Sequence, residues 1–335
     1  MIISTSQTCM VNGPSDDDTE SDMHVSASEV RLFTVDALQH GERLDRVLVQ
    51  GVPEFSRNYL QKLIVDGAIM VNSQVATKAS MRLQAGTRIS AELRPTPDTL
   101  AFCAQEMSLD IVYEDADLLV INKPAGLVVH PAAGNWSGTL LNGLLAYDKC
   151  AAQLPRAGIV HRLDKDTSGL ILVGRTLQAC TALVRMIAAR EVRREYVALA
   201  QGQWPLTDRE QVRIIDAPVG RDPRSRVKMS ILPQGKPART DVTLLEGNAL
   251  YSLVQCRLHS GRTHQIRVHM ASVGCPLVGD VLYGGKPLGQ MQRQALHAFR
   301  LALAHPVSQK PLFFEQPSPE DLKLAVKMSG LGYNL

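Results

Sequence analysis

Residues 161–170 read HRLDKDTSGL, a polar stretch between two short apolar runs. The first run is Ile159-Val160, and the second is LILV at 170–173. Short apolar runs that end at turn-forming residues are typical of buried strands, and residues 166–169 supply such a turn. We therefore expect a tight polar loop between two core strands. Loops that a rigid scaffold holds in this way often carry the charged groups of an active site.

Asp164 and Arg162 have two interpretations from the residues alone. An aspartate in a loop is usually a turn residue, and an arginine beside it is usually its surface partner. A carboxylate on a rigid loop is also a common catalytic group. The complete string HRLDKDTSGL resembles the catalytic motif of the RluA/RluD family of pseudouridine synthases, whose HRLD aspartate is the nucleophile. The resemblance implies that Asp164 is the nucleophile and that Arg162 fills the space left by an extruded uridine.

The composition is that of an ordinary globular protein. Of the 335 residues, 45% are apolar and 21% are charged, and the length suggests about two domains. No apolar run approaches the roughly 18 residues of a transmembrane helix, and the N-terminus lacks the pattern of a signal peptide. The six cysteines are scattered without a CxxC pair, which favours a reducing compartment over a zinc site. We expect a cytoplasmic protein that does not associate with membranes.

The charge is unevenly distributed. Residues 1–30 contain six acidic residues and no lysine or arginine, and we expect them to form a disordered acidic tail. The rest of the chain holds 36 basic and 27 acidic residues, a net charge of +9. A basic body suits a polyanionic partner, although many proteins with this balance bind none.

Residues 31–94 have the pattern of one small module. We expect two amphipathic helices, one beginning at Arg43 and one over 57–66, and then a strand at 68–71. The pattern resembles an S4 RNA-binding domain, although Asn72-Ser73 stands where that family usually has Asn-Gly. Basic residues on helices are often merely solvated, but the resemblance implies phosphate contacts for Arg43, Arg46, Arg57 and Lys62.

Residues 95–106 begin with two prolines, and we expect them to link the module to a second domain at 107–335. That domain opens with a predicted hairpin over 109–124. Residues 122–131 then resemble the NKP…VHP element of the same synthase family. Lys123 and His130 are candidates for substrate binding, but Lys123 is equally suited to holding a loop and His130 to holding a backbone carbonyl.

Tyr196 lies in a predicted strand over 193–199, which follows a predicted helix over 178–190. A single tyrosine in a strand is usually a core residue whose hydroxyl is bonded to a carbonyl. The strand also resembles the REY element of the synthase family, and this implies that Tyr196 stacks on the target base.

Residues 260–269 read SGRTHQIRVH and resemble a further motif of the family. The resemblance assigns Arg267 a salt bridge to Asp164, and a guanidinium in this position keeps a partly buried carboxylate ionised. We also assign His161 and Arg262 to substrate binding.

Three histidines, His259, His264 and His269, invite a metal interpretation. Their spacing of five residues matches neither an HExxH helix nor a zinc knuckle. We therefore expect no metal site.

Residues 219–240 are basic and rich in Gly, Pro and Ser, so we expect them at the surface. They form either a solvated hairpin or a segment that follows the RNA backbone beside the site. The second interpretation assigns RNA contacts to Arg221, Arg224, Arg226 and Lys228. Two later elements, at 276–284 and 296–306, keep the family's order, so the resemblance covers roughly residues 31–320.

The resemblance implies an α+β fold, in which the S4 domain precedes a catalytic domain with a mixed, largely antiparallel sheet flanked by helices. It implies isomerisation of uridine to pseudouridine without a cofactor. The RluD type modifies a stem-loop of large-subunit ribosomal RNA, which we expect as the substrate, either naked or in assembling particles. We expect a monomer. Two alternatives stay open: an inactive S4-type RNA-binding protein, and a nucleoside glycosidase, which normally needs a second carboxylate.

Overall fold

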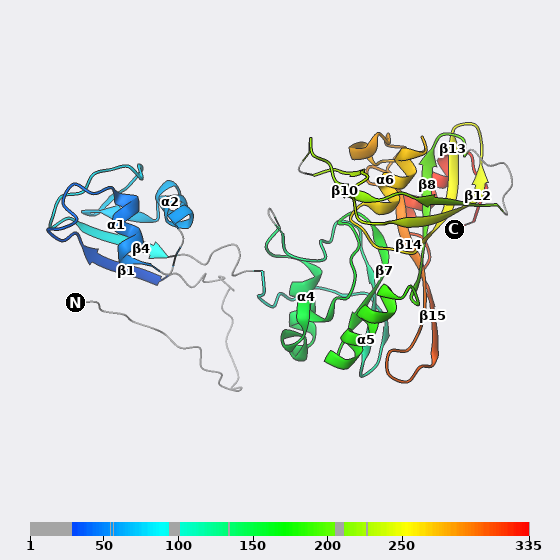
Figure 1. The fold of residues 1–335 in the computed structure, drawn as a ribbon, viewed down its shortest axis with the longest axis horizontal. Coiled ribbons are helices and arrows are strands. Elements are labelled where there is room, and N and C mark those ends of the chain that lie inside the picture. The colour runs from blue at the N-terminus through cyan, green and yellow to red at the C-terminus, as the bar shows by residue number, and fades with distance from the viewer. Residues whose placement is uncertain are drawn as a thin grey trace, which may run out of the picture. The chain divides into compact units, whose positions relative to one another are not determined.

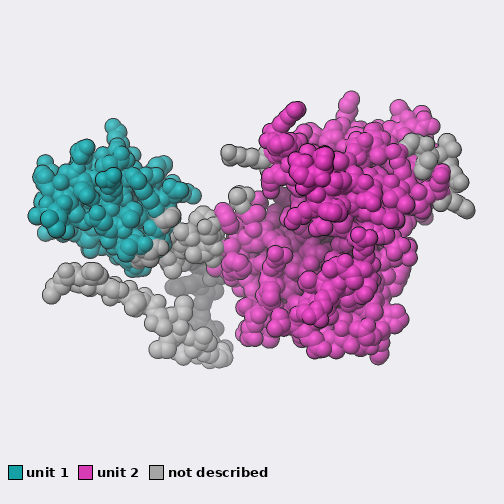
Figure 2. Space-filling view, in the orientation of Figure 1, with its two compact units in different colours: residues 1–100 teal, residues 101–335 magenta. Residues whose placement is uncertain are grey.

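The structure, a computed structural model, describes residues 29–53, 55, 57–93, 101–132, 135–204, 211–225 and 227–334. It divides into two compact units, residues 1–100 and 101–335, each with its own hydrophobic core (Figures 1 and 2). None of the helices in the described ranges combines the length and apolar character needed to cross a bilayer.

The first unit is a four-stranded antiparallel sheet with two helices, in the order β1-β4-β2-β3 across the sheet. The apolar helix faces predicted from the sequence are buried in one core, which confirms the helical periods. Asn72 and Ser73 both have positive φ (48° and 68°), so this pair makes the turn that Asn-Gly usually makes. The elements are β1 (Glu29–Thr34), α1 (Leu44–Gly51), α2 (Arg57–Val65), β2 (Ile69–Val71), β3 (Gln74–Val75) and β4 (Arg88–Leu93).

β1 corrects the predicted end of the acidic tail. Glu29 and Val30 pair with Leu93 and Glu92 of β4, so the sheet already includes residues that we expected in the tail. The remaining residues of the predicted tail, 1–28, lie outside the described residues.

Asp45 joins the two helices of the first unit. Its carboxylate is fully buried and accepts hydrogen bonds from Arg43, Arg57 and Gln61, the shortest being 2.7 Å from Arg57 Nη2. Burial raises the pKa of Asp45, but these hydrogen bonds outweigh burial and hold the pKa below its ordinary value. Arg43 and Arg57 therefore have an internal partner that the sequence did not reveal, whereas Arg46 and Lys62 are exposed.

The second unit is built on a nine-stranded sheet, in the order β5-β6-β7-β14-β8-β13-β12-β9, with β15 paired to β14 (Figure 1). Among the described strand pairs, β7–β14 is the parallel one, so the sheet is mixed and largely antiparallel, as predicted. The strands are β5 (Ile111–Glu114), β6 (Leu118–Lys123), β7 (Ser168–Gly174), β8 (Arg193–Gln201), β9 (Val212–Asp216), β12 (Arg239–Gly247), β13 (Tyr251–Leu258), β14 (Leu296–Ala304) and β15 (Pro311–Glu315).

Helices cover both faces of this sheet. Because side chains alternate between faces along a strand, Tyr196 and Ala198 pack with α4 (Leu140–Tyr147) and α6 (Gln265–Ser272) on one side. The other face packs with α5 (Leu177–Ala188) in one cluster and with α7 (Glu320–Met328) in another. The connecting elements are η1 (Lys149–Gln153), η2 (Pro155–Gly158), β10 (Val219–Arg221), β11 (Met229–Ile231) and η3 (Val281–Tyr283).

The polar loop differs from its prediction on one side. β7 follows the loop as expected, but Ile159 makes a single bridge to Val173 and begins no strand. The backbone turns sharply just before it, since Arg156, Ala157 and Gly158 all have positive φ.

Residues 101–106 were predicted to be part of a linker, but they pack in the second unit. Asn142 Nδ2 donates to the carbonyls of Ala101 and Cys103, and Gln105 accepts from Gly138 N, so these residues belong to the second unit. The rest of the expected linker, 95–100, lies outside the described residues. The helical period of α5 predicts Val184 in its buried stripe with Leu183, but the Val184 side chain is 53% exposed.

Candidate active site

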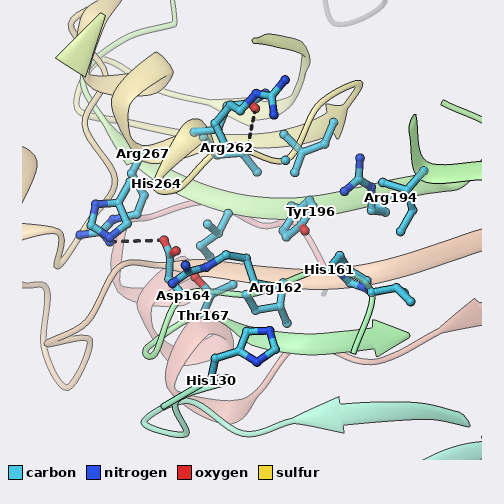
Figure 3. Close-up of a pocket in the computed structure, with 18 of the residues that line it drawn as sticks. His130, His161, Arg162, Asp164, Thr167, Arg194, Tyr196, Arg262, His264 and Arg267 are labelled. Atoms are coloured by element: carbon cyan, nitrogen blue, oxygen red, sulfur yellow. Dashed lines mark hydrogen bonds and ion pairs between the residues drawn. The ribbon is translucent and has the colours of Figure 1, made fainter. Parts of the chain in front are cut away.

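The predicted catalytic loop opens into a pocket of about 510 Å³, within the roughly 300–1,000 Å³ typical of small-molecule sites (Figure 3). Strand register explains why distant segments meet there. Ala298 of β14 lies level with Gly169 of β7 on one side and with Tyr196 of β8 on the other. A Cβ on Gly169 would lie 2.2 Å from the Ala298 carbonyl oxygen, so this close approach requires glycine.

Buried hydrogen bonds hold the loop in place. The Lys123 ammonium is fully buried and donates to the carbonyls of Pro124, Leu127 and Lys165. Burial lowers the pKa of Lys123 to about 7, against the opposing charges of Asp166 and Asp164. The assignment of Lys123 to substrate binding is therefore wrong, because the buried ammonium joins the segment after β6, through Pro124 and Leu127, to Lys165 of the polar loop.

Asp164 lies in the pocket and pairs with Arg267, as the resemblance implied. Arg267 Nη1 is 3.3 Å from Asp164 Oδ2, and both side chains are mostly buried (Figure 3). Asp280 is a second partner that the sequence analysis did not assign, and it is the closer one. Arg267 Nε and Nη2 lie 2.7 and 2.9 Å from its two oxygens.

This arrangement fixes the charge of the guanidinium. Burial alone would lower the pKa of Arg267, but hydrogen bonds and charge from Asp280, and then from Asp164, raise it. A bidentate bond to Asp280 also fixes the plane of the guanidinium, so Nη1 is aimed at Asp164. Asp280 ends the sequence PLVGD at 276–280, and nothing in the spacing of that sequence indicated an ion pair with a residue 13 positions earlier.

Tyr196 lines the pocket and is 4% exposed. Burial raises the pKa of its hydroxyl to about 12, although the charge of Arg194 opposes the shift. The hydroxyl makes no hydrogen bond to any described residue, unlike the core tyrosine that was the alternative interpretation. The ring is therefore placed as a neutral surface beside Asp164.

The remaining predicted substrate residues line the pocket in different ways. Arg162 is exposed and makes no ion pair within the described part of the chain. His161 Nε2 accepts a hydrogen bond from the Leu172 amide at 2.8 Å, so one ring nitrogen is already used by β7. Arg262 is exposed and donates to the Pro237 carbonyl. His130 lines the pocket, and burial, followed by the charges of two nearby arginines, lowers its pKa to about 4.

The basic segment after β9 contains a hairpin, β10–β11, that is tied to the site. Met229 N donates to the hydroxyl of Tyr283, which also hydrogen-bonds His264 at the start of α6. Arg221 and Arg224 are exposed, Lys228 is half-buried, and Arg226 lies outside the described residues. Their contact with RNA remains a prediction.

Comparisons with known proteins agree with this geometry. Residues 117–272 match the family model for RNA pseudouridylate synthase, and residues 42–89 match the S4 domain. A protein of Neisseria meningitidis serogroup B, named ribosomal large subunit pseudouridine synthase D, is 45% identical over 94% of this chain and 87% of its own length. The chain belongs to the RNA pseudouridylate synthase family.

Other relatives of the synthase extend the comparison. The protein of the same name from Escherichia coli K12 is 43% identical over 88% of this chain and 93% of its own length. The structure of human RNA pseudouridylate synthase domain containing 4 superposes with a TM-score of 0.52, over 67% of this chain and 94% of that one. At 22% identity, that likeness concerns the fold. The synthase thus has the predicted α+β fold with an S4 domain and a catalytic domain.

Proposed function

We propose that the protein isomerises specific uridines to pseudouridine in large-subunit ribosomal RNA. The observation that carries the proposal is the ion pair of Asp164 with Arg267, beside Tyr196 in one pocket. The printed name of the relatives supports ribosomal RNA as the substrate. A ribosomal substrate also favours the cytoplasm as the place of action.

In this reaction the N1–C1′ glycosidic bond breaks, the uracil turns, and C5 bonds to C1′, while C5 loses a proton and N1 gains one, so the product is an isomer of the substrate. We assign Tyr196 to stacking on the uracil, because its ring and the Asp164 carboxylate line the same pocket. Asp164 attacks the sugar or takes a proton from it, and in either role its carboxylate is held in place by the ion pair with Arg267. No external group enters the product.

The pocket argues against the glycosidase alternative. Of the described residues that line it, Asp164 is the one carboxylate. Hydrolysis of a glycosidic bond normally uses two carboxylates on opposite sides of that bond. Asp166 lines a separate cavity with Asp280, Arg293 and Asp321, so it is not placed to serve as the second.

Tritium release tests the proposal. RNA labelled at C5 of uridine loses its label when C5 bonds to C1′, whereas a glycosidase leaves that label on free uracil. We expect release of tritium to water from transcribed large-subunit RNA. Binding of RNA without release would instead identify an inactive RNA-binding protein.

Arg162→Met should lower activity strongly on a folded stem-loop and much less on an unstructured strand. Extruding a base costs a few kcal/mol, and Arg162 lines the pocket with an exposed guanidinium that has no ion pair among the described residues, so it is suited to filling the space that the base leaves. Single-turnover rates on the two RNAs measure the difference. Equal losses on both would show that Arg162 has another role.

Deleting residues 1–100 should weaken RNA binding more than it slows the chemical step. The first unit carries exposed basic residues, such as Arg46 and Lys62, and phosphate contacts mainly position RNA. The second unit has its own core and keeps the pocket. Affinity as a function of salt, and the rate at saturating RNA, separate the two effects. Unchanged affinity with a slower rate would contradict the expectation.

A further inference from the structure

Arg194 is a buried cation without an acidic partner. Its side chain lies in β8 and is 4% exposed, yet it makes no hydrogen bond or ion pair with any described residue. Burying an unpaired charge is costly, and burial lowers the pKa of this guanidinium from its ordinary value. The free protein therefore carries a charge that its own fold does not neutralise.

The alternation of β8 explains why no carboxylate meets this charge. Arg194 and Tyr196 point to the pocket side, whereas Glu195 points to the other face, where it pairs with Arg193 and Arg300. Asp164, the carboxylate of the pocket, is held by Arg267 at the other end. Figure 3 shows Tyr196 between Asp164 and Arg194.

A second unsatisfied donor lies beside Arg194. His161 Nε2 accepts from the Leu172 amide, so in the neutral ring Nδ1 carries the hydrogen. His161 Nδ1 is buried and has no hydrogen-bond partner among the described residues. Burial, followed by the charge of Arg194, lowers the pKa of His161 to about 3, so this ring is neutral at pH 7. One end of the pocket thus holds a guanidinium and an imidazole N–H that have no acceptor among the described residues.

We propose that Arg194, with His161 beside it, binds a phosphodiester group next to the target uridine. The proposal rests on the proposed function, since it concerns the same RNA in the same pocket. A guanidinium matches a phosphate in planar, bidentate geometry, and the anion supplies the charge that the fold lacks. A uracil carbonyl would accept a hydrogen bond but would leave the cation uncompensated. When Tyr196 stacks on the base, Arg194 is two residues along the strand, on the side away from Asp164.

The test compares Arg194→Met with Arg193→Met, a neighbour on the opposite face of the same strand. On a stem-loop that the wild type modifies, Arg194→Met should lower kcat/KM by about 10- to 100-fold. This is the loss expected when a hydrogen bond to a charged group is removed. Arg193→Met should stay near the wild type. In phosphate-free buffer, the unfolding midpoint of Arg194→Met should equal or exceed that of the wild type, because an unpaired buried charge is removed. A purely structural arginine would instead lower the midpoint when replaced.

RNAs with one uncharged backbone linkage can show which phosphodiester Arg194 contacts. Two stem-loops are needed, each with a single phosphodiester replaced by an uncharged methylphosphonate. In one RNA the replaced linkage is 5′ to the target uridine, and in the other it is 3′ to it. The wild type should lose activity with one of these RNAs, and Arg194→Met should lose no more with that RNA than with the unmodified one. Equal sensitivity of Arg194→Met and wild type to both neutral linkages would overturn the proposal and favour a uracil carbonyl as the partner.

A binding measurement is independent of turnover. Inorganic phosphate at constant ionic strength should raise the unfolding midpoint of the wild type and of Arg193→Met, but not of Arg194→Met. If phosphate shifts all three equally, the pocket has no anion site at Arg194. If the wild type makes no pseudouridine, the proposed function fails, while the phosphate measurement still decides the anion site.

Discussion

Asp164→Asn should yield a folded protein that binds RNA nearly as well as the wild type and makes no detectable pseudouridine. The variant keeps the shape of the side chain but removes the charge that attack or proton transfer requires. It should fold because Arg267 retains Asp280, to which it is bonded at 2.7 and 2.9 Å. Removing the reacting group typically costs several orders of magnitude in rate.

Single-turnover kinetics with saturating RNA measure this loss, and Asp166→Asn is the matched control. A turn-forming aspartate often caps its own loop, but the Asp166 side chain makes no hydrogen bond within the described residues. Instead the Asp166 carbonyl accepts a bond from Arg293 Nη1, which an asparagine would preserve. Asp166→Asn should therefore turn over at close to the rate of the wild type. If Asp164→Asn remained within about tenfold of the wild type, a loss of only ~1.4 kcal/mol, the catalytic assignment would be wrong.

Arg267→Met should cost both activity and stability. Asp280 is 1% exposed, and removing its guanidinium partner leaves a buried, uncompensated carboxylate, which typically costs about 3–5 kcal/mol. Asp164 also loses the side chain with which it forms its ion pair. Denaturant unfolding and single-turnover rates measure the two losses separately.

The double variant Arg267→Met/Asp280→Leu separates the roles of Arg267. Replacing a buried ion pair with apolar side chains is often neutral for stability, so the double variant should recover most of the lost unfolding free energy. It should not recover activity, because Asp164 still lacks its partner. A double variant that regained both would show that Arg267 acts only by supporting the fold.

The local patterns of the chain predicted most of its fold. The helices of the first unit, the hairpin over 109–124 and the strand that carries Tyr196 all follow from apolar periodicity. The prediction was wrong at Ile159, where the turn at 156–158 leaves a single bridge instead of a strand. A short apolar run cannot reveal such a turn, because the turn depends on contacts between distant parts of the backbone. Here Gly158 lies so close to the Gly174 carbonyl that a side chain at 158 would not fit.

Site residues within the loop motif could be predicted from the sequence. The residues that pair with them from distant parts of the chain were harder to predict. Asp164 and Arg267 are 103 residues apart, and the resemblance alone connected them. Lys123 was misassigned because a lysine is usually exposed, whereas here three backbone carbonyls stabilise it in the core. The alternation of side chains along β8 predicts that Arg194 lies on the same face as Tyr196. Only the three-dimensional structure shows that its buried Nε has no hydrogen-bond partner among the described residues.

The central claim is that uridine within ribosomal RNA is isomerised rather than cleaved. The most direct test incubates unmodified large-subunit RNA with the purified protein and then quantifies uridine, pseudouridine and free uracil, with positions mapped along the RNA. The account predicts that pseudouridine appears at a few defined positions, that uridine falls by the same amount, that no free uracil forms, and that Asp164→Asn abolishes the change. Release of free uracil, or unchanged RNA that is nevertheless bound, would contradict it.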